Sequence, residues 1–142
     1  MPRDKKVNFD QLSVGDNAEI RRTLTQDALD GIVLIFGDPD SGGESDWFAA
    51  RAAPQPIQSH TTWLGALISA TFALVLPDGE RSRLVQTVRF HQPVKLGDSV
   101  TVAATVIEKV PDGGRLVLDC IARNQRGQTV ASGTTEATFP PT

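Results

Sequence analysis

The stretch HTTWLGALISATFALVL, residues 60–76, is the most apolar part of the chain and decides the fold. Its apolar residues fall on nearly every face of a helix, which is typical of a helix in the middle of a domain. The stretch is too short, and contains too many Thr and Ser residues, for a convincing membrane span. Pro77, Asp78 and Gly79 follow it and end the helix. We therefore expect a central helix that the rest of the chain must cover.

The segments after this helix have the pattern of strands separated by short turns, which predicts an antiparallel meander. Before the helix, the sequence predicts a short strand, a helix with Thr25 as its N-cap, and a long loop rich in Gly and Pro. The expected strands are residues 18–23, 84–90, 99–110, 115–124 and 129–139, the first helix is 25–36 and the loop is 38–56.

An apolar helix and a curved antiparallel sheet hide each other's apolar surfaces when the sheet wraps around the helix. This arrangement is the hot-dog fold. We therefore predict an α+β fold of the hot-dog type, in which an antiparallel curved β-sheet wraps around a long central apolar helix. The 142 residues are the usual size of one domain, so we expect a single domain over residues 1–142, with residues 1–8 flexible.

The rare residues exclude several kinds of chemistry. Cys120 is the only cysteine and His60 and His91 are the only histidines, so neither an intrachain disulfide nor a three-histidine metal site can form. We expect no metal. The net charge of −3 argues against a nucleic-acid partner. Residues 1–9 are charged and lack the apolar run of a signal peptide, so we expect a cytoplasmic protein that does not associate with a membrane.

Several motifs resemble the MaoC-like family of (R)-specific enoyl-CoA hydratases and dehydratases. The most specific is RFHQPVKLGD at residues 89–98, and the others are FDQLSVG at 9–15, the pair Gly37-Asp38, His60 before the apolar helix and NQRG at 124–127. The resemblance covers the chain from about residue 9 to residue 139. It implies the hot-dog fold and an acyl-CoA thioester as the substrate, with coenzyme A as part of that substrate and no separate cofactor.

The family's catalytic signature resembles Gly-Asp-x-Asn-Pro-x-His, and the chain departs from it. Asp38 matches the family's aspartate, but an ungapped match places Gly43 at the histidine of the catalytic dyad. His60 matches the family's histidine before the helix, and Thr61 replaces the glycine that follows it. The resemblance thus implies that Asp38 acts on the water together with the dyad histidine that Gly43 replaces, and that the backbone N–H of Thr61 polarises the thioester oxygen. His60 is a candidate catalytic residue in place of that histidine, although a helix-capping or supporting role is the commoner explanation.

Two acidic residues, Glu44 and Asp46, are the other candidates to replace the missing dyad histidine, although an acidic loop is the commoner explanation. Arg89, Lys95 and Arg126 are the candidates for binding the phosphates of coenzyme A, because guanidinium and ammonium groups bind phosphate. Cys120 lies within an expected strand and is interpreted as a packed side chain rather than a nucleophile.

Three functions are consistent with these residues. The first is a MaoC-like hydratase or dehydratase with weakened or altered activity. The second is a non-catalytic acyl-CoA-binding subunit that pairs with an active MaoC-like chain. The third is a hot-dog thioesterase in which Asp38 activates a water. Because unpaired edge strands favour strand addition, we expect a homodimer or a dimer of dimers with one continuous sheet, and a hetero-oligomer is the alternative.

Overall fold

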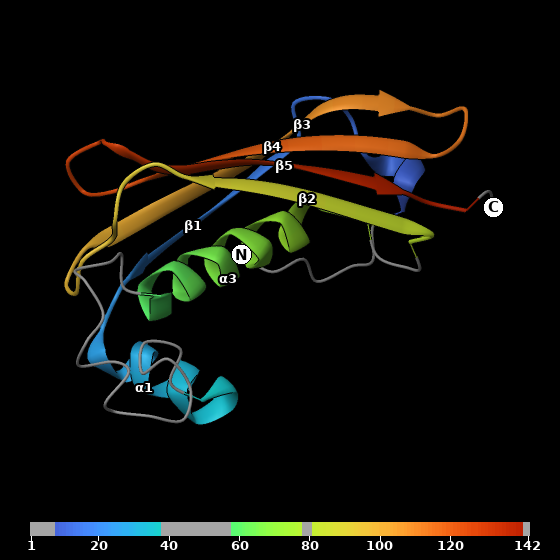
Figure 1. The fold of residues 1–142 in the computed structure, drawn as a ribbon. Helices are drawn as coiled ribbons and strands as arrows, with labels where there is room; N and C mark the ends of the chain where they lie inside the picture. The colour runs from blue at the N-terminus through green and yellow to red at the C-terminus, as the bar shows by residue number, and fades with distance from the viewer. Residues whose placement is uncertain (1–7, 38–57, 78–80, 141–142) are drawn as a thin grey trace.

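The computed structural model describes residues 8–37, 58–77 and 81–140. Figure 1 shows one sheet with a long helix lying across one face and a second, shorter helix at the end of that long helix. The elements are η1 (Phe9–Gln11), β1 (Asn17–Thr23), α1 (Gln26–Phe36), α3 (Gln58–Val75), β2 (Arg83–Phe90), β3 (Ser99–Val110), β4 (Arg115–Arg123) and β5 (Thr129–Thr138). The predicted helices and strands are therefore confirmed to within about two residues at most ends, and the loop predicted at 38–56 lies outside the described residues.

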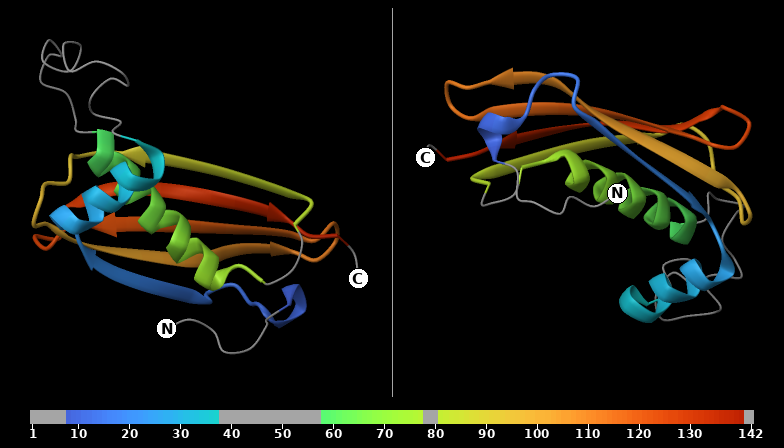
Figure 2. Two further views of the ribbon diagram at one scale, coloured as in Figure 1. Left: turned by 90° about the horizontal axis from the view of Figure 1, so that it is seen from below. Right: turned by 180° about the vertical axis from the view of Figure 1, so that it is seen from behind.

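The sheet is antiparallel throughout, with the strand order β1-β3-β4-β5-β2. The prediction of a meander is right for β3, β4 and β5 and wrong for β2, which pairs with β5 rather than with β3. The connection from β2 to β3 contains Pro93 and a turn closed by the N–H of Asp98 on the carbonyl of Lys95. It runs past the end of the sheet, as Figure 2 shows, and so joins strands that are not neighbours.

The core lies between α3 and the face of the sheet that it covers. On that face, β3 and β4 present alternate buried residues, as expected for strands with one covered side. The largest fully buried side chains of α3 are Leu64, Ile68 and Phe72. Burying one such side chain stabilises the fold by about 1.5–3 kcal/mol. The buried strand residues are Val100, Val102, Ala104 and Val106 in β3 and Leu116, Leu118, Cys120 and Ala122 in β4.

Cys120 is one of these buried residues, which confirms that it is a packed side chain. Burial raises the pKa of its thiol to about 11, and the neighbouring Asp119 carboxylate adds to the shift. A thiol with such a high pKa is protonated at neutral pH and is a poor nucleophile.

The helix α3 packs on β1, β3 and β4 of the sheet and on α1, and one of its sides is exposed in the described part of the chain. That exposed side carries the small residues Ala66, Ser69, Ala70 and Ala73. The sheet and α1 therefore leave one side of α3 uncovered within the described residues. None of the described helices is long and apolar enough to cross a membrane.

The edge strand β2 and the end of α1 both expose apolar side chains. Leu84 and Phe90 in β2 are 42% and 46% exposed, and Leu34 and Phe36 in α1 are 86% and 73% exposed. The start of α1 is fixed by Thr25, whose side-chain oxygen accepts a hydrogen bond from the backbone N–H of Ala28 at 3.2 Å, as predicted.

Candidate functional site

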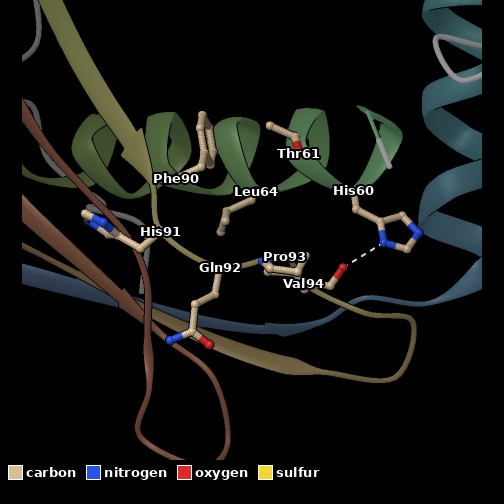
Figure 3. A pocket seen from close by; sticks show the side chains of 8 residues that line it. All are labelled: His60, Thr61, Leu64, Phe90, His91, Gln92, Pro93 and Val94. Carbon is tan, nitrogen blue, oxygen red and sulfur yellow. Dashed lines mark hydrogen bonds between the residues drawn. The ribbon is translucent and has the colours of Figure 1, made fainter. Parts of the chain in front are cut away.

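A cavity of about 140 Å³ lies beside the N-terminal end of α3. One wall is the first part of that helix, and the other is the end of β2 with the residues that follow it (Figure 3). Two of the predicted catalytic residues therefore lie on one cavity. The lining consists of His60, Thr61, Leu64, Phe90, His91, Gln92, Pro93 and Val94.

His60 is the titratable group on the helix wall of this cavity, and its ring is held by one hydrogen bond. Its Nδ1 lies 2.7 Å from the backbone carbonyl oxygen of Val94. Because a carbonyl oxygen only accepts, Nδ1 carries the proton and donates it. In the neutral ring, Nε2 then holds the lone pair and can act as a base. Figure 3 shows Nε2 on the side of the ring that faces away from Val94.

The turn that carries Val94 is anchored by the buried Asp98. One carboxylate oxygen of Asp98 accepts from the backbone N–H of Lys95 at 2.9 Å, and the other accepts from the Gln125 side-chain amide at 2.9 Å. These two hydrogen bonds lower the pKa of Asp98, with smaller contributions from the positive charges of Arg126 and Lys95. The partner of His60 is thus part of a rigid turn rather than of an isolated loop.

The turn is also tied to the segment before α1. Gly97 adopts a φ of +93°, which favours glycine, and its N–H donates to the carbonyl of Leu24. The backbone N–H of Leu24 in turn donates to the carbonyl of Asp98 at 2.8 Å. Leu24 itself is fully buried. The position of Val94, and with it the orientation of His60, therefore depends on contacts from two distant parts of the chain, at Leu24 and at Gln125.

Thr61 lies in the first turn of the described part of α3 and is half-buried on the cavity wall. The N-terminal end of a helix carries a partial positive charge from its aligned peptide dipoles. A ligand oxygen that enters the cavity beside Thr61 is therefore close to a positive potential.

The three predicted coenzyme A-binding residues are exposed, but the structure does not bring all of them together. Lys95 and Arg126 both act on the same carboxylate, that of Asp98, so they lie on the same side of the molecule. Arg89 is paired with Ser132 in the β2–β5 register and lines a separate hollow with Thr87, Asp119 and Thr134. Because successive strand residues point to opposite faces, Arg89 points away from the face to which Phe90 points.

Sequence reasoning missed most of the wall that faces His60. Phe90, Gln92 and Val94 line the cavity, and all three fall within the RFHQPVKLGD segment that carried the family resemblance. His91, interpreted as structural, also lines the cavity, and its Nε2 lies 2.8 Å from the Ser132 hydroxyl oxygen. Asp38, Gly43, Glu44 and Asp46 lie outside the described residues, so their predicted roles stay predictions.

Comparisons with known proteins agree with this fold. No family model matches the chain. It is 30% identical over 120 residues to a 3-hydroxybutyryl-CoA dehydratase of Methylorubrum extorquens. The matched region covers 84% of this chain and 76% of that protein. It is 23% identical over 104 residues to an (R)-specific enoyl-CoA hydratase of Rhodospirillum rubrum, covering 73% of this chain and 72% of that protein.

Among solved structures, the R-hydratase PhaJ1 of Pseudomonas aeruginosa matches with a TM-score of 0.73 and 33% identity, over 96% of this chain and 88% of that one. The five-stranded antiparallel sheet with a long helix across one face therefore defines a hot-dog protein, as predicted. Within that class, the identity to the dehydratase and the extent of the match show the family. The chain belongs to the MaoC-like (R)-specific enoyl-CoA hydratase and dehydratase family.

Proposed function

We propose that this chain is a hydratase or dehydratase that adds water to, or removes it from, the C2–C3 bond of an enoyl-CoA thioester. The observation that carries the proposal is His60 on the cavity wall, with its Nδ1 proton held by Val94 at 2.7 Å. The two family members at 30% and 33% identity support the reaction class, since one is a dehydratase of an acyl-CoA and the other an R-hydratase.

In this proposal His60 takes the place of the dyad histidine, whose position Gly43 occupies in the ungapped match. Asp38 accepts a hydrogen bond from the water and holds it. Nε2 of His60 takes a proton from that water as its oxygen bonds to C3, and negative charge develops on the thioester oxygen. The imidazolium then returns the proton to C2, so the product gains one water and no other group. Dehydration is the same sequence in reverse.

The first turn of α3 supports the charge that develops in this step. The positive end of the helix dipole lies beside Thr61, where it stabilises an enolate-like oxygen. Because the dyad histidine is replaced by a residue at a different position, we expect a weakened rate compared with an enzyme that keeps both. A positioned general acid or base contributes about 10²- to 10⁴-fold to a rate.

Lys95 and Arg126 are the proposed partners for the phosphates of coenzyme A. The positive charges of both residues lower the pKa of Asp98, which supports a shared positive region next to the turn that holds Val94. Arg89 stays a prediction, because it lines the separate hollow with Ser132 and not the cavity. No cofactor other than the coenzyme A of the substrate is proposed, and a cytoplasmic location also stays a prediction.

A second copy of the chain is the proposed partner. The strand β2 lies at an edge of the sheet and exposes apolar side chains, which favours pairing with another edge strand. A homodimer with one continuous sheet, or a dimer of dimers, is therefore expected, and a hetero-oligomer with an active MaoC-like chain is the alternative. Light scattering at micromolar concentration tests this, and a monomer would count against it.

The test of the reaction is a paired assay on crotonyl-CoA that follows both the enoyl absorbance and the release of thiol. The variants are Asp38→Asn and His60→Asn, and Asp112→Asn in the exposed β3–β4 turn is the control. Asparagine at position 60 can still donate to Val94 but offers no base. We expect the native protein to consume the enoyl group without thiol release, and the first two variants to lose about 10²- to 10⁴-fold of that rate.

The other outcomes identify the alternatives. Full activity in His60→Asn would mean that the histidine only positions the helix end. Thiol release would indicate a thioesterase. No turnover, combined with thermal stabilisation by acyl-CoA, would favour the non-catalytic subunit, for which the glycine at position 43 is the supporting observation.

A further inference from the structure

The cavity beside α3 is small for a fatty acyl group. Its volume is about 140 Å³. A dry protein cavity of about 150 Å³ holds a benzene molecule, which has six carbons. A chain of about four carbons, together with its thioester carbonyl, is therefore what this space accommodates.

One aromatic side chain, that of Phe90, lines the cavity away from His60. Figure 3 shows Phe90 pointing towards α3, farther from His60 than Thr61 is, with His91 farther still. A Cβ added at Gly65, one helix position after the buried Leu64, would have the ring Cζ of Phe90 as its nearest surrounding atom, at 3.9 Å. The tip of the aromatic ring thus faces α3 at Gly65, where an added Cβ would be in ordinary van der Waals contact with it.

Two of the other apolar lining residues, Leu64 and Val94, belong to the core, whereas Pro93 is exposed. Leu64 and Val94 are 2% and 4% exposed. Phe90 is different, because it is 46% exposed and lies at the end of the edge strand β2. Removing the ring therefore enlarges the cavity along α3 without removing a core residue.

From these contacts we infer that Phe90 sets the length of the acyl group and restricts the substrate to short-chain acyl-CoA thioesters of about four carbons. The inference rests on the proposed function, since it assigns the cavity to the acyl group. The acyl chain starts at the carbonyl beside Thr61, runs along the first turns of α3 and stops against the ring of Phe90 over Gly65. A longer chain meets the ring and cannot extend.

The test compares the native protein with Phe90→Ala and Phe90→Leu on the enoyl-CoA thioesters of four, six and eight carbons. Two quantities are measured: kcat/KM for hydration, and the dissociation constants of butyryl-CoA and octanoyl-CoA, which are saturated and do not react. Ile107→Ala is the matched control, because Ile107 is an apolar side chain 47% exposed on β3 and does not line the cavity.

We expect the native protein to prefer four carbons over eight by at least about tenfold, since one methylene in an apolar pocket changes kcat/KM by about 10- to 200-fold. Phe90→Ala should raise the ratio of eight-carbon to four-carbon kcat/KM by at least about tenfold, Phe90→Leu by less, and Ile107→Ala should leave it unchanged. An unchanged ratio in both Phe90 variants, or a native preference for eight carbons, would overturn the inference.

The binding measurement separates this inference from the proposed function. Chain-length-dependent binding that Phe90→Ala relaxes, without any turnover, would support the inference and overturn catalysis. Turnover with an unaltered chain-length ratio would overturn only the inference. If neither saturated thioester binds to the native protein, both are overturned.

Discussion

Replacing Asp98 with asparagine is expected to destabilise the turn that holds His60. Both carboxylate oxygens accept hydrogen bonds, one from the N–H of Lys95 and one from the Gln125 amide. Gln125 cannot simply turn its amide around, because its Oε1 accepts from the N–H of Ser99 at 3.1 Å. Asparagine keeps one acceptor oxygen and places an NH₂ group against a donor at the other position.

The size of the effect follows from these contacts. A hydrogen bond to a charged group contributes about 1.5–3 kcal/mol, and an unsatisfied buried donor costs about 1–3 kcal/mol. Asp98 is only 7% exposed, so solvent cannot replace the lost partner fully. We therefore expect Asp98→Asn to lower the free energy of unfolding by about 2–4 kcal/mol, which is a fall in Tm of roughly 6–12 °C for a chain of this size.

The pH dependence of this difference gives a second check. The folded state lowers the pKa of Asp98. Its carboxylate therefore contributes stability at pH values above the pKa of the unfolded state, which is about 4 for an aspartate. That contribution is lost as the pH falls through the lower, folded-state pKa. The gap in stability between the native protein and the variant should therefore be constant from about pH 7 to about pH 5 and shrink below about pH 4.

Urea unfolding followed by circular dichroism, at several pH values, measures both quantities. Asp112→Asn, an exposed aspartate in the β3–β4 turn, controls for the loss of a negative charge. If the free energies of unfolding of Asp98→Asn and of this control differ by less than about 0.5 kcal/mol at pH 7, the reasoning is refuted, since that is the ordinary range for surface substitutions.

Two further substitutions test the packing of β5. Thr135 is fully buried, and its hydroxyl has no hydrogen-bond partner among the described residues, so Thr135→Val should raise the free energy of unfolding by about 1 kcal/mol. Thr71→Val is the comparison, because the equally buried Thr71 hydroxyl donates to a helix carbonyl at 2.8 Å, so this variant should not stabilise the fold. Equal changes in the free energy of unfolding for Thr135→Val and Thr71→Val would contradict the argument. Gly133→Ala places a Cβ 2.8 Å from the carbonyl oxygen of Thr87 on β2, so it should loosen the β2–β5 pairing and lower Tm by several degrees; an unchanged Tm would show that the edge strand shifts at no cost.

Much of the fold could be predicted because its elements are encoded locally. The apolar run at 60–76 predicted α3, Thr25 predicted the start of α1, and turn residues separated the strands. The partner of β2 could not be predicted this way. Residues 91–98 contain turn signals, as hairpins do, but the register of β2 with β5 joins residues more than forty positions apart.

Some residues of the candidate site could likewise be predicted from the sequence, and others could not. His60 and Thr61 were found from the chain itself, because they stand at the start of the apolar helix, where His60 matches a family histidine and Thr61 takes the place of the glycine after it. The sequence by itself thus determined the helix, the strands and the residues with chemical groups, since propensity, capping and periodicity act over a few neighbouring positions. Only the tertiary structure decided that Val94 holds the ring of His60 across 34 positions and that Phe90 closes the cavity over Gly65. Those contacts depend on how α3 lies across the sheet, which is set by packing of the whole core.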